Sequence, residues 1–180
     1  MNERRDVIKN RKAILQGYID MTSEKNIEKI TVSDVIKKAN VSRATFYAHY
    51  KDVNTLKETF EMDFTNILIK QMEESISMLF KDSSQSVFNI FNTFEKNKKM
   101  VSALSGNGTS ESFFLLFKKS FSNELMKQMS TNNKAVSVVT SQTISSIIID
   151  NCRDIVVSKR KTISNETRAT IVSHFIPKKV

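Results

Sequence analysis

The chain has 180 residues, of which 39% are hydrophobic, with three glycines and one proline. This length allows one or two domains with a sizeable core, and the scarcity of glycine and proline predicts a nearly all-α fold. A single cysteine, Cys152, excludes an intrachain disulfide framework. The longest apolar run is five residues, far short of the roughly 20 that span a bilayer, and the polar start is unlike a secretory leader, so we expect a cytoplasmic protein without a membrane anchor.

The net charge of +9 is unevenly distributed. Residues 1–51 carry 11 Lys or Arg against 6 Asp or Glu, residues 151–180 carry 7 against 2, and the middle of the chain is nearly neutral. A basic N-terminal end suits a polyanion such as nucleic acid, although a modest excess of lysine is often only a solvated surface. Charge alone therefore leaves the partner open.

The first predicted element is a helix over about residues 6–25. We expect it to end at Asn26, because asparagine tolerates the left-handed backbone conformation that closes a helix. Apolar residues recur at helical spacing and predict one buried face: Val7, Ile8, Ile14, Leu15, Tyr18, Ile19 and Met21.

A short helix is predicted next, over about residues 32–39. The Thr31 hydroxyl is placed to accept a backbone N–H bond near Asp34, whose charge favours the positive end of the helix. The residues expected to face inward are Val35, Ile36 and Ala39.

A second short helix, of about eight residues, is predicted after a turn at Asn40. Ser42 is a good N-cap for it, and Phe46 and Tyr50 share its buried side because they lie one turn apart. Two short helices propped by a longer one predict a helix-turn-helix, whose second short helix enters the major groove of DNA. The same geometry also occurs in plain helical bundles. The residues left mostly outward are Arg43, Ala44, Thr45, Tyr47 and His49.

Residues 14–56 resemble the N-terminal domain of TetR/AcrR-type transcriptional regulators, without an insertion or deletion. The resemblance implies a three-helix DNA-binding domain at residues 1–51, with the motif at about 31–50, and a helical ligand-binding and dimerisation domain at residues 52–180. The matching features are Ile14-Leu15, Thr31-Val32-x-Asp34, Ala39-x-Val41-Ser42 and Thr45-Phe46-Tyr47-x-His49-Tyr50.

The resemblance also implies which residues contact DNA. In such regulators the tyrosine and histidine of the third helix commonly contact phosphates, and the start of that helix faces the groove. Arg43 is the best candidate for base recognition, because a guanidinium can donate hydrogen bonds to both major-groove acceptors of guanine. The alternative is that Arg43 binds a phosphate. The candidate DNA-binding residues are Thr31, Ser33, Ser42, Arg43, Ala44, Thr45, Tyr47, His49 and Lys51.

The chain departs from the family pattern at three positions. The usual glycines that end the first helix and fill the turn are Asn26 and Asn40, which backbone sterics permit. The lysine that usually begins the fourth helix is Val53. Lys51 is the candidate to replace it as a phosphate ligand.

Further helices are predicted in the remainder of the chain. Apolar residues repeat every three or four positions over about residues 52–80, including Ile67, and again from residues 87 and 113. The latter helix is expected to be about 20 residues long. The segment 134–150 is rich in β-branched residues, which suit a strand, but its pattern fits a helix over a length that strands do not reach. Ser164 is expected to cap a last helix, which Pro177 stops.

The resemblance implies a homodimer, because in such regulators the last two helices pack against the same pair of a second subunit. A two-fold dimer presents two DNA-binding helices that are about one DNA turn, or a whole number of turns, apart. The partner is therefore expected to be double-stranded DNA with a near-palindromic operator. The alternative is that these residues cover the monomer's own core. The candidate interface residues are Ile144, Ile147, Ile148, Ile155, Ile171 and Phe175.

Twelve phenylalanines and eight methionines suggest a pocket for a small hydrophobic effector, although core packing is the more frequent role of such residues. We interpret the chain as a dimeric repressor that such an effector releases from its operator. The alternative is a helical protein-interaction module with a basic surface and no specific DNA target. The candidate pocket residues are Phe64, Phe88, Phe91, Phe94, Phe113 and Phe117.

An enzyme is not expected. The chain has two histidines, His49 and His174, and lacks an HExxH motif, paired cysteine ligands and a phosphate-binding glycine loop. No catalytic residue, cofactor or metal site is predicted. Cys152 is interpreted as a small buried apolar residue.

Overall fold

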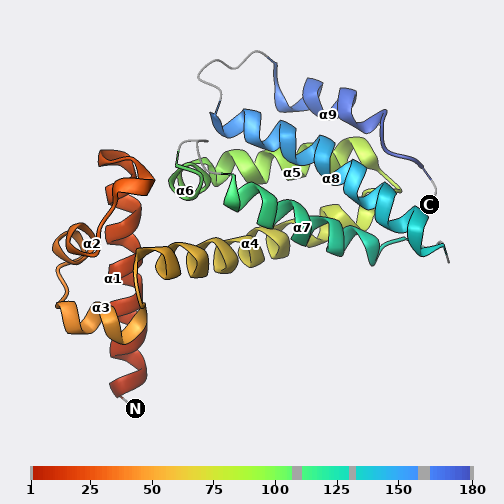
Figure 1. The fold of residues 1–180 in the computed structure, drawn as a ribbon. Coiled ribbons are helices and arrows are strands. Elements are labelled where there is room, and N and C mark those ends of the chain that lie inside the picture. The colour runs from red at the N-terminus through yellow and green to blue at the C-terminus, as the bar shows by residue number, and fades with distance from the viewer. Residues whose placement is uncertain (1, 107–110, 130–132, 158–162, 179–180) are drawn as a thin grey trace. The chain divides into compact units, whose positions relative to one another are not determined.

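The computed structural model describes residues 2–106, 111–129, 133–157 and 163–178 (Figure 1). The regular elements in these ranges are all helices, which confirms the predicted all-α fold. The glycine-rich stretch Gly106-Asn107-Gly108, whose composition predicts a loop, lies mostly outside the described residues. The elements are α1 Asn2–Glu24, a 3-10 helix at Ile27–Lys29, α2 Val32–Ala39, α3 Arg43–His49, α4 Val53–Met78, α5 Ser83–Lys96, α6 Lys98–Leu104, α7 Ser112–Met126, α8 Lys134–Val157 and α9 Asn165–Ser173.

By its internal contacts the chain divides into two compact units, Met1–Asp63 and Phe64–Val180. The start of α4 belongs to the first unit, because the Phe60 ring lies edge-on to the Tyr18 ring at 6.5 Å. The predicted functional boundary at residues 51/52 falls between α3 and α4, whereas the two compact units divide at residues 63/64. The assignment of residues 1–51 to DNA binding and of residues 52–180 to ligand binding and dimerisation stays a prediction.

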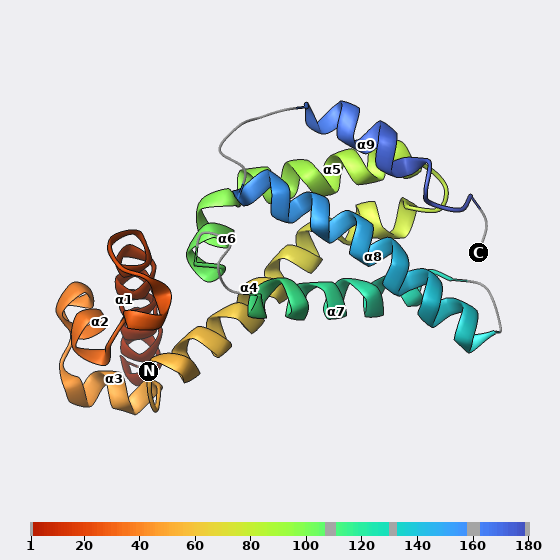
Figure 2. The same cartoon turned by 45° about the horizontal axis from the view of Figure 1, so that its top comes forward.

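The first unit is a small helical cluster in which α1 packs against α2 and α3 (Figure 2). Its core contains side chains from α1, α2, α3 and the start of α4. Tyr18 is buried in this core, and burial raises the pKa of its hydroxyl. The two short helices are stable here because α1 packs on their apolar sides and because they pack on each other. The fully buried residues of this core are Ile14, Tyr18, Val35, Phe46 and Leu56.

The first turns of α1 differ from the prediction. The helix begins at Asn2, four residues earlier than expected, and Val7 and Ile8 are 46% and 50% exposed. Assigning these two residues to the buried face was therefore wrong. The buried face begins only at Ile14, where α1 packs on the rest of the unit.

The end of α1 also differs from the prediction. The helix ends at Glu24, and Asn26 has a φ of −58° rather than a left-handed conformation. Asn26 instead caps the 3-10 helix, since its side-chain oxygen accepts a hydrogen bond from the Glu28 N–H at 3.0 Å. Asn40 is the asparagine that adopts the left-handed conformation, with a φ of 51°.

The second unit is a helical bundle in which α7 packs on α8, and α5 packs on both α8 and α9 (Figure 1). The segment rich in β-branched residues is helical, as predicted, and forms most of α8. Ile67 on α4 is 49% exposed, so including it in the buried pattern was wrong. α7 has 15 residues rather than about 20.

Polar contacts hold α9 against α8 and α5. The Arg168 guanidinium, in a residue only 9% exposed, donates to Asn151 Oδ1 at 3.0 Å and to Asp154 Oδ2 at 2.7 Å. Asn165 Nδ2 donates to Glu95 Oε2 at 2.7 Å. Ser164 caps α9, as predicted, by accepting a hydrogen bond from the Thr167 N–H.

Cys152 is fully buried on α8, as predicted, and burial raises the pKa of its thiol. Within the described ranges, no helix is long and apolar enough to cross a membrane.

Candidate nucleic-acid interface

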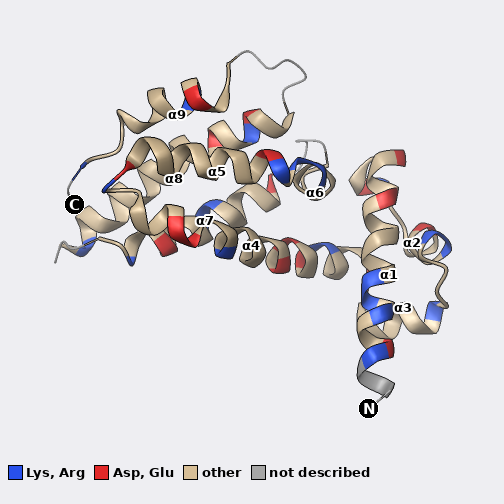
Figure 3. Cartoon of the chain, turned by 180° about the vertical axis from the view of Figure 1, so that it is seen from behind, with Lys and Arg blue, Asp and Glu red and all other residues tan. Residues whose placement is uncertain are grey.

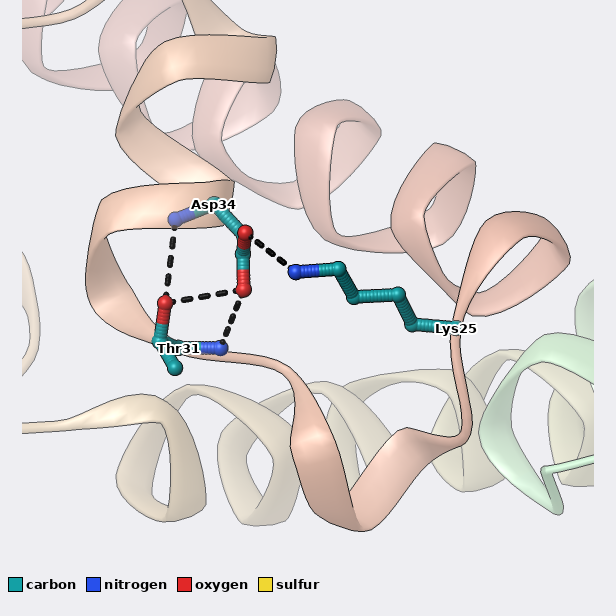
Figure 4. A network of polar contacts seen from close by, with 3 residues as sticks. All are labelled: Lys25, Thr31 and Asp34. Carbon is teal, nitrogen blue, oxygen red and sulfur yellow. Dashed lines mark hydrogen bonds and ion pairs between the residues drawn. The ribbon is translucent and has the colours of Figure 1, made fainter.

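α2 begins at a reciprocal cap between Thr31 and Asp34 (Figure 4). The Asp34 N–H donates to Thr31 Oγ1 at 3.2 Å, and the Thr31 N–H donates to Asp34 Oδ2 at 2.9 Å. Lys25 Nζ lies 2.6 Å from Asp34 Oδ1 and, with further hydrogen bonds from Thr31, lowers the pKa of Asp34 to about 2. The Thr31 hydroxyl, a candidate DNA contact, therefore already caps α2 in the free protein.

The turn between α2 and α3 is set by Asn40 and Ser42. Asn40 is left-handed, a conformation that asparagine tolerates better than most residues, so the chain reverses direction within a few residues. Ser42 is extended, and its Oγ accepts a hydrogen bond from the Thr45 N–H at 2.9 Å. Ser42 is thus the N-cap of α3, as predicted.

α3 has one buried and one exposed side. Phe46 is fully buried and Tyr50, its C-cap residue, is 6% exposed. Arg43, Ala44 and Tyr47 are exposed. The Tyr47 ring packs edge-on against Phe46 at 5.6 Å, which orients it while 49% of the residue stays accessible. Thr45 and His49 are half-buried.

Arg43 and Ser33 lie together on the surface. Arg43 Nη2 donates a hydrogen bond to Ser33 Oγ at 3.1 Å, and this contact joins the exposed start of α3 to α2. Two candidate DNA-binding residues from different helices are thus adjacent in the free protein. A guanidinium keeps further donors when one is engaged, so Arg43 retains capacity for a second acceptor.

Lys51 follows α3 and is exposed. Asp52 beside it accepts a hydrogen bond from the Thr55 N–H at 2.7 Å, which lowers the pKa of Asp52 and caps α4. Val53, at the position of the family's usual lysine, is the first residue of α4. That Lys51 replaces this lysine stays a prediction.

The comparisons with known proteins agree with this geometry. No protein-family model matches the chain. The chain superimposes on the crystal structure of a TetR transcriptional regulator from Streptococcus agalactiae 2603V with a TM-score of 0.71, at 23% identity over 98% of both chains. The chain therefore has the fold of a TetR transcriptional regulator. It is also similar in fold to the dihydroxyacetone kinase operon activator DhaS, with a TM-score of 0.60, at 15% identity over 92% of both chains.

The sequence relatives are helix-turn-helix regulators. YxbF of Bacillus subtilis (strain 168), an uncharacterized HTH-type transcriptional regulator, is 31% identical over 102 residues, which are 56% of this chain and 25% of YxbF. YvdT of the same organism, described in the same words, is 42% identical over 43 residues, which are 24% of this chain and 22% of YvdT. The chain thus matches about a quarter of each of these relatives.

Four of the six candidate effector residues, Phe64, Phe94, Phe113 and Phe117, form a cluster of contacting rings, whereas Phe88 is half-buried and outside these ring contacts. Phe91, Phe94, Phe113 and Phe117 are fully buried, and Phe64 is 6% exposed. The ring centroids of Phe94 and Phe117 lie 5.0 Å apart, and those of Phe113 and Phe117 lie 6.1 Å apart, which is direct contact. These rings therefore form part of the core, and a ligand among them has to displace some of them.

The six candidate interface residues fall into two groups. Ile144 and Ile148 are 2% and 0% exposed, so they belong to the core of their own unit and have almost no surface to offer a partner. Assigning them to an interface was wrong for that reason. Ile171 and Phe175 are 52% and 64% exposed, and the remaining two, Ile147 and Ile155, are half-buried.

The sequence reasoning did not identify how α1 positions α2. Gly17 lies in the middle of α1, and a Cβ added there would be 2.8 Å from the Ala39 backbone nitrogen. Lys38 Nζ lies 2.6 Å from Glu24 Oε1 and supplies a second link between the two helices. A glycine inside an otherwise regular helical pattern was the available signal, since it often marks a close approach of backbones.

Proposed function

We propose that the chain is a sequence-specific DNA-binding transcriptional regulator whose reading element is α3. The observation that carries this proposal is the two-sided character of α3. Phe46 holds the helix in the core, while Arg43, Ala44 and Tyr47 remain exposed at the surface. An exposed helix with this composition has the donors that base edges and phosphates accept.

In this proposal Arg43 recognises a base. Its guanidinium donates to the two major-groove acceptors of a guanine. These bonds form in place of the bond to the Ser33 hydroxyl, or in addition to it. Tyr47, His49 and Lys51 bind phosphates and fix the register of α3 in the groove. Ser42 and Thr31 act mainly through the helix starts that they cap.

The regulator is proposed to act as a homodimer on a near-palindromic operator. The exposed apolar residues Ile171 on α9 and Phe175 just after it support a contact with a second copy, because large exposed apolar side chains favour burial. A two-fold dimer carries two α3 helices, which read two half-sites related by the same symmetry.

A small hydrophobic effector is proposed to release the regulator from DNA, so that the regulator represses in its absence. Such a ligand acts only if it prefers a conformation in which the two α3 helices are wrongly spaced for the operator. The phenylalanine cluster around Phe117 is the proposed region of binding, by displacement of rings. One structural neighbour is named an operon activator, so the fold alone does not set the sign of regulation.

The test of this function is selection of bound duplexes from a random pool by the full chain. We expect enrichment of a near-palindrome whose half-sites are one DNA turn apart, or a multiple. Arg43→Ala in the same selection should recover the spacing but lose preference at one position of each half-site. A wild-type pool that stays random after repeated rounds contradicts the proposal, and it favours a helical protein-interaction module.

A further inference from the structure

The N-terminal half of α1 is rich in cations. Residues 2–12 contain five Lys or Arg against two Asp or Glu. Arg5, Lys9 and Lys12 are exposed and recur at four- and three-residue spacing, so they lie on one face of the helix. Val7 and Ile8 beside them are also about half-exposed.

This stretch is energetically unfavourable for a helix in isolation. Glu3 and Asp6 suit the positive amino end of the helix dipole, but Arg5 and Lys9, which lie four residues apart on one face, repel each other. Most helical stability in proteins comes from packing of an apolar face, and these turns contribute almost nothing to the core. An anionic partner would offset both deficits at once.

The position of the stretch points to the same partner as α3. Arg11 Nη2 lies 2.5 Å from Asp63 Oδ2, and the Arg11 side chain also reaches the hydroxyl of Tyr50, the C-cap residue of α3. Lys9 and Lys12 are within one turn of Arg11 along the helix, which places this part of α1 beside the end of α3. Figures 1 and 3 show the basic N-terminal half of α1 and α3 at the same end of the first unit.

We propose that Arg5, Lys9 and Lys12 form a second phosphate-binding element, which contacts the DNA backbone next to the base pairs that α3 reads. The partner is duplex DNA, so the proposal rests on the proposed function of α3. Cations on a helix face neutralise phosphates and release counterions, and they carry no base information. The element therefore adds affinity without changing the recognised sequence.

The test compares two charge-matched triple variants of the full chain. One is Arg5→Gln/Lys9→Gln/Lys12→Gln, and the control is Lys118→Gln/Lys119→Gln/Lys134→Gln in the second unit. Both lower the net charge from +9 by three. The dissociation constant of each is measured against salt concentration, on a selected duplex and on a scrambled duplex of equal length.

We expect the first variant to lower the slope of log affinity against log salt by about 2 to 3, since each lost phosphate contact removes about 0.9. Its ratio of specific to scrambled affinity should stay within about twofold of wild type, because phosphate contacts position and base contacts specify. The control variant should retain the wild-type slope. A wild-type slope in the first variant, or an equal loss in the control, overturns the proposal.

These measurements distinguish a failure of the proposed reading by α3 from a failure of the proposed α1 element. If the wild type binds both duplexes equally and the first variant still loses slope, sequence-specific reading by α3 is wrong and the α1 element stands. If the wild type is specific and the first variant keeps the wild-type slope, sequence-specific reading by α3 stands and the α1 element is wrong. Binding of neither duplex by the wild type contradicts both.

Hydrogen exchange supplies a readout that does not depend on a variant's folding. In the wild-type chain, amides of residues 2–12 should exchange fast when free and slow by at least about tenfold when the selected duplex is added, as the exposed turns become ordered. Unchanged exchange there, with slowing at residues 42–50, overturns the α1 element alone.

Discussion

The Arg43 guanidinium donates a hydrogen bond to the Ser33 hydroxyl across 3.1 Å, so the exposed start of α3 is oriented by α2 before any DNA is present. Long cationic side chains lose considerable rotamer freedom when they bind, and an existing contact reduces that loss. Under the proposed function, this relationship gives the two residues different roles: Arg43 would read a base, and Ser33 would position Arg43.

Ser33→Ala tests this division of roles. We expect a loss of affinity for the selected duplex of about two- to fivefold, with folding stability within about 0.5 kcal/mol of wild type because the site is on the surface. In an Arg43→Ala background the same substitution should have almost no further effect, which fluorescence anisotropy on the four proteins measures. Additive losses in the double variant would show that Ser33 contacts DNA independently of Arg43.

Gly17→Ala should destabilise the first unit although alanine is the better helix former. The new Cβ meets the Ala39 backbone nitrogen at 2.8 Å and the Ala39 Cβ at 2.9 Å. Overpacking costs about 1–3 kcal/mol, and the gain in helix propensity returns only about 1 kcal/mol. Because the nearest atom belongs to the backbone and cannot move cheaply, the cost is expected at the upper end, about 2–3 kcal/mol, and the net loss in urea unfolding is about 1–2 kcal/mol. Gln16→Ala, one residue away on the exposed side, is the matched control, and an equal or higher stability of Gly17→Ala contradicts the close packing.

Acid should weaken the first unit through Asp34. Its folded-state pKa of about 2 lies below the ordinary value of 3.8, so the folded state binds fewer protons than the unfolded state in this range. The stabilisation from Asp34 is therefore fully present above about pH 4 and is lost as the pH falls toward 2. Asp34→Asn should flatten that part of the stability curve measured by urea unfolding. A variant curve with the wild-type slope between pH 4 and pH 2 would show that the network in Figure 4 does not operate in solution.

Phe175→Ser should weaken self-association without unfolding the chain. Phe175 is 64% exposed, so its removal costs little within one copy but removes apolar area from a contact between copies. Sedimentation at micromolar concentration should show a dimer for wild type and a shift toward monomer for the variant. Leu115→Ser, at a residue 61% exposed on α7, is the control and should remain dimeric. A wild-type monomer contradicts the proposed dimer.

Much of the first unit could be predicted from local sequence. The Thr31–Asp34 and Ser42–Thr45 caps depend on residues three apart, and the Phe46 and Tyr50 positions follow from helical periodicity. These signals are local, so they do not require knowledge of the tertiary fold.

The errors in the prediction have tertiary causes. Val7 and Ile67 match a buried pattern but are about half-exposed, because no element in the described part of the chain covers them fully. Asn26 was expected to close α1, but a 3-10 helix follows and uses its side chain as a cap instead. Ile144 and Ile148 could not be separated from exposed isoleucines before the packing of α8 was known.

Contacts between distant residues were also not predictable. The Arg168–Asp154 ion pair and the Arg43–Ser33 hydrogen bond join polar residues with no local pattern. The basic start of α1 was visible as charge, but its position beside α3 depends on the contact of Arg11 with Tyr50.

The most direct test of the central claim is the ratio of affinities for the selected duplex and a scrambled duplex, measured for wild type and for Arg43→Ala. We expect a wild-type ratio of at least about a thousandfold, and a loss of about 1–3 kcal/mol of discrimination for each Arg43 contact that the variant removes. Lys118→Ala, in the second unit, should keep the wild-type ratio. A ratio near one for wild type, or an Arg43→Ala ratio equal to that of wild type, would contradict reading by α3.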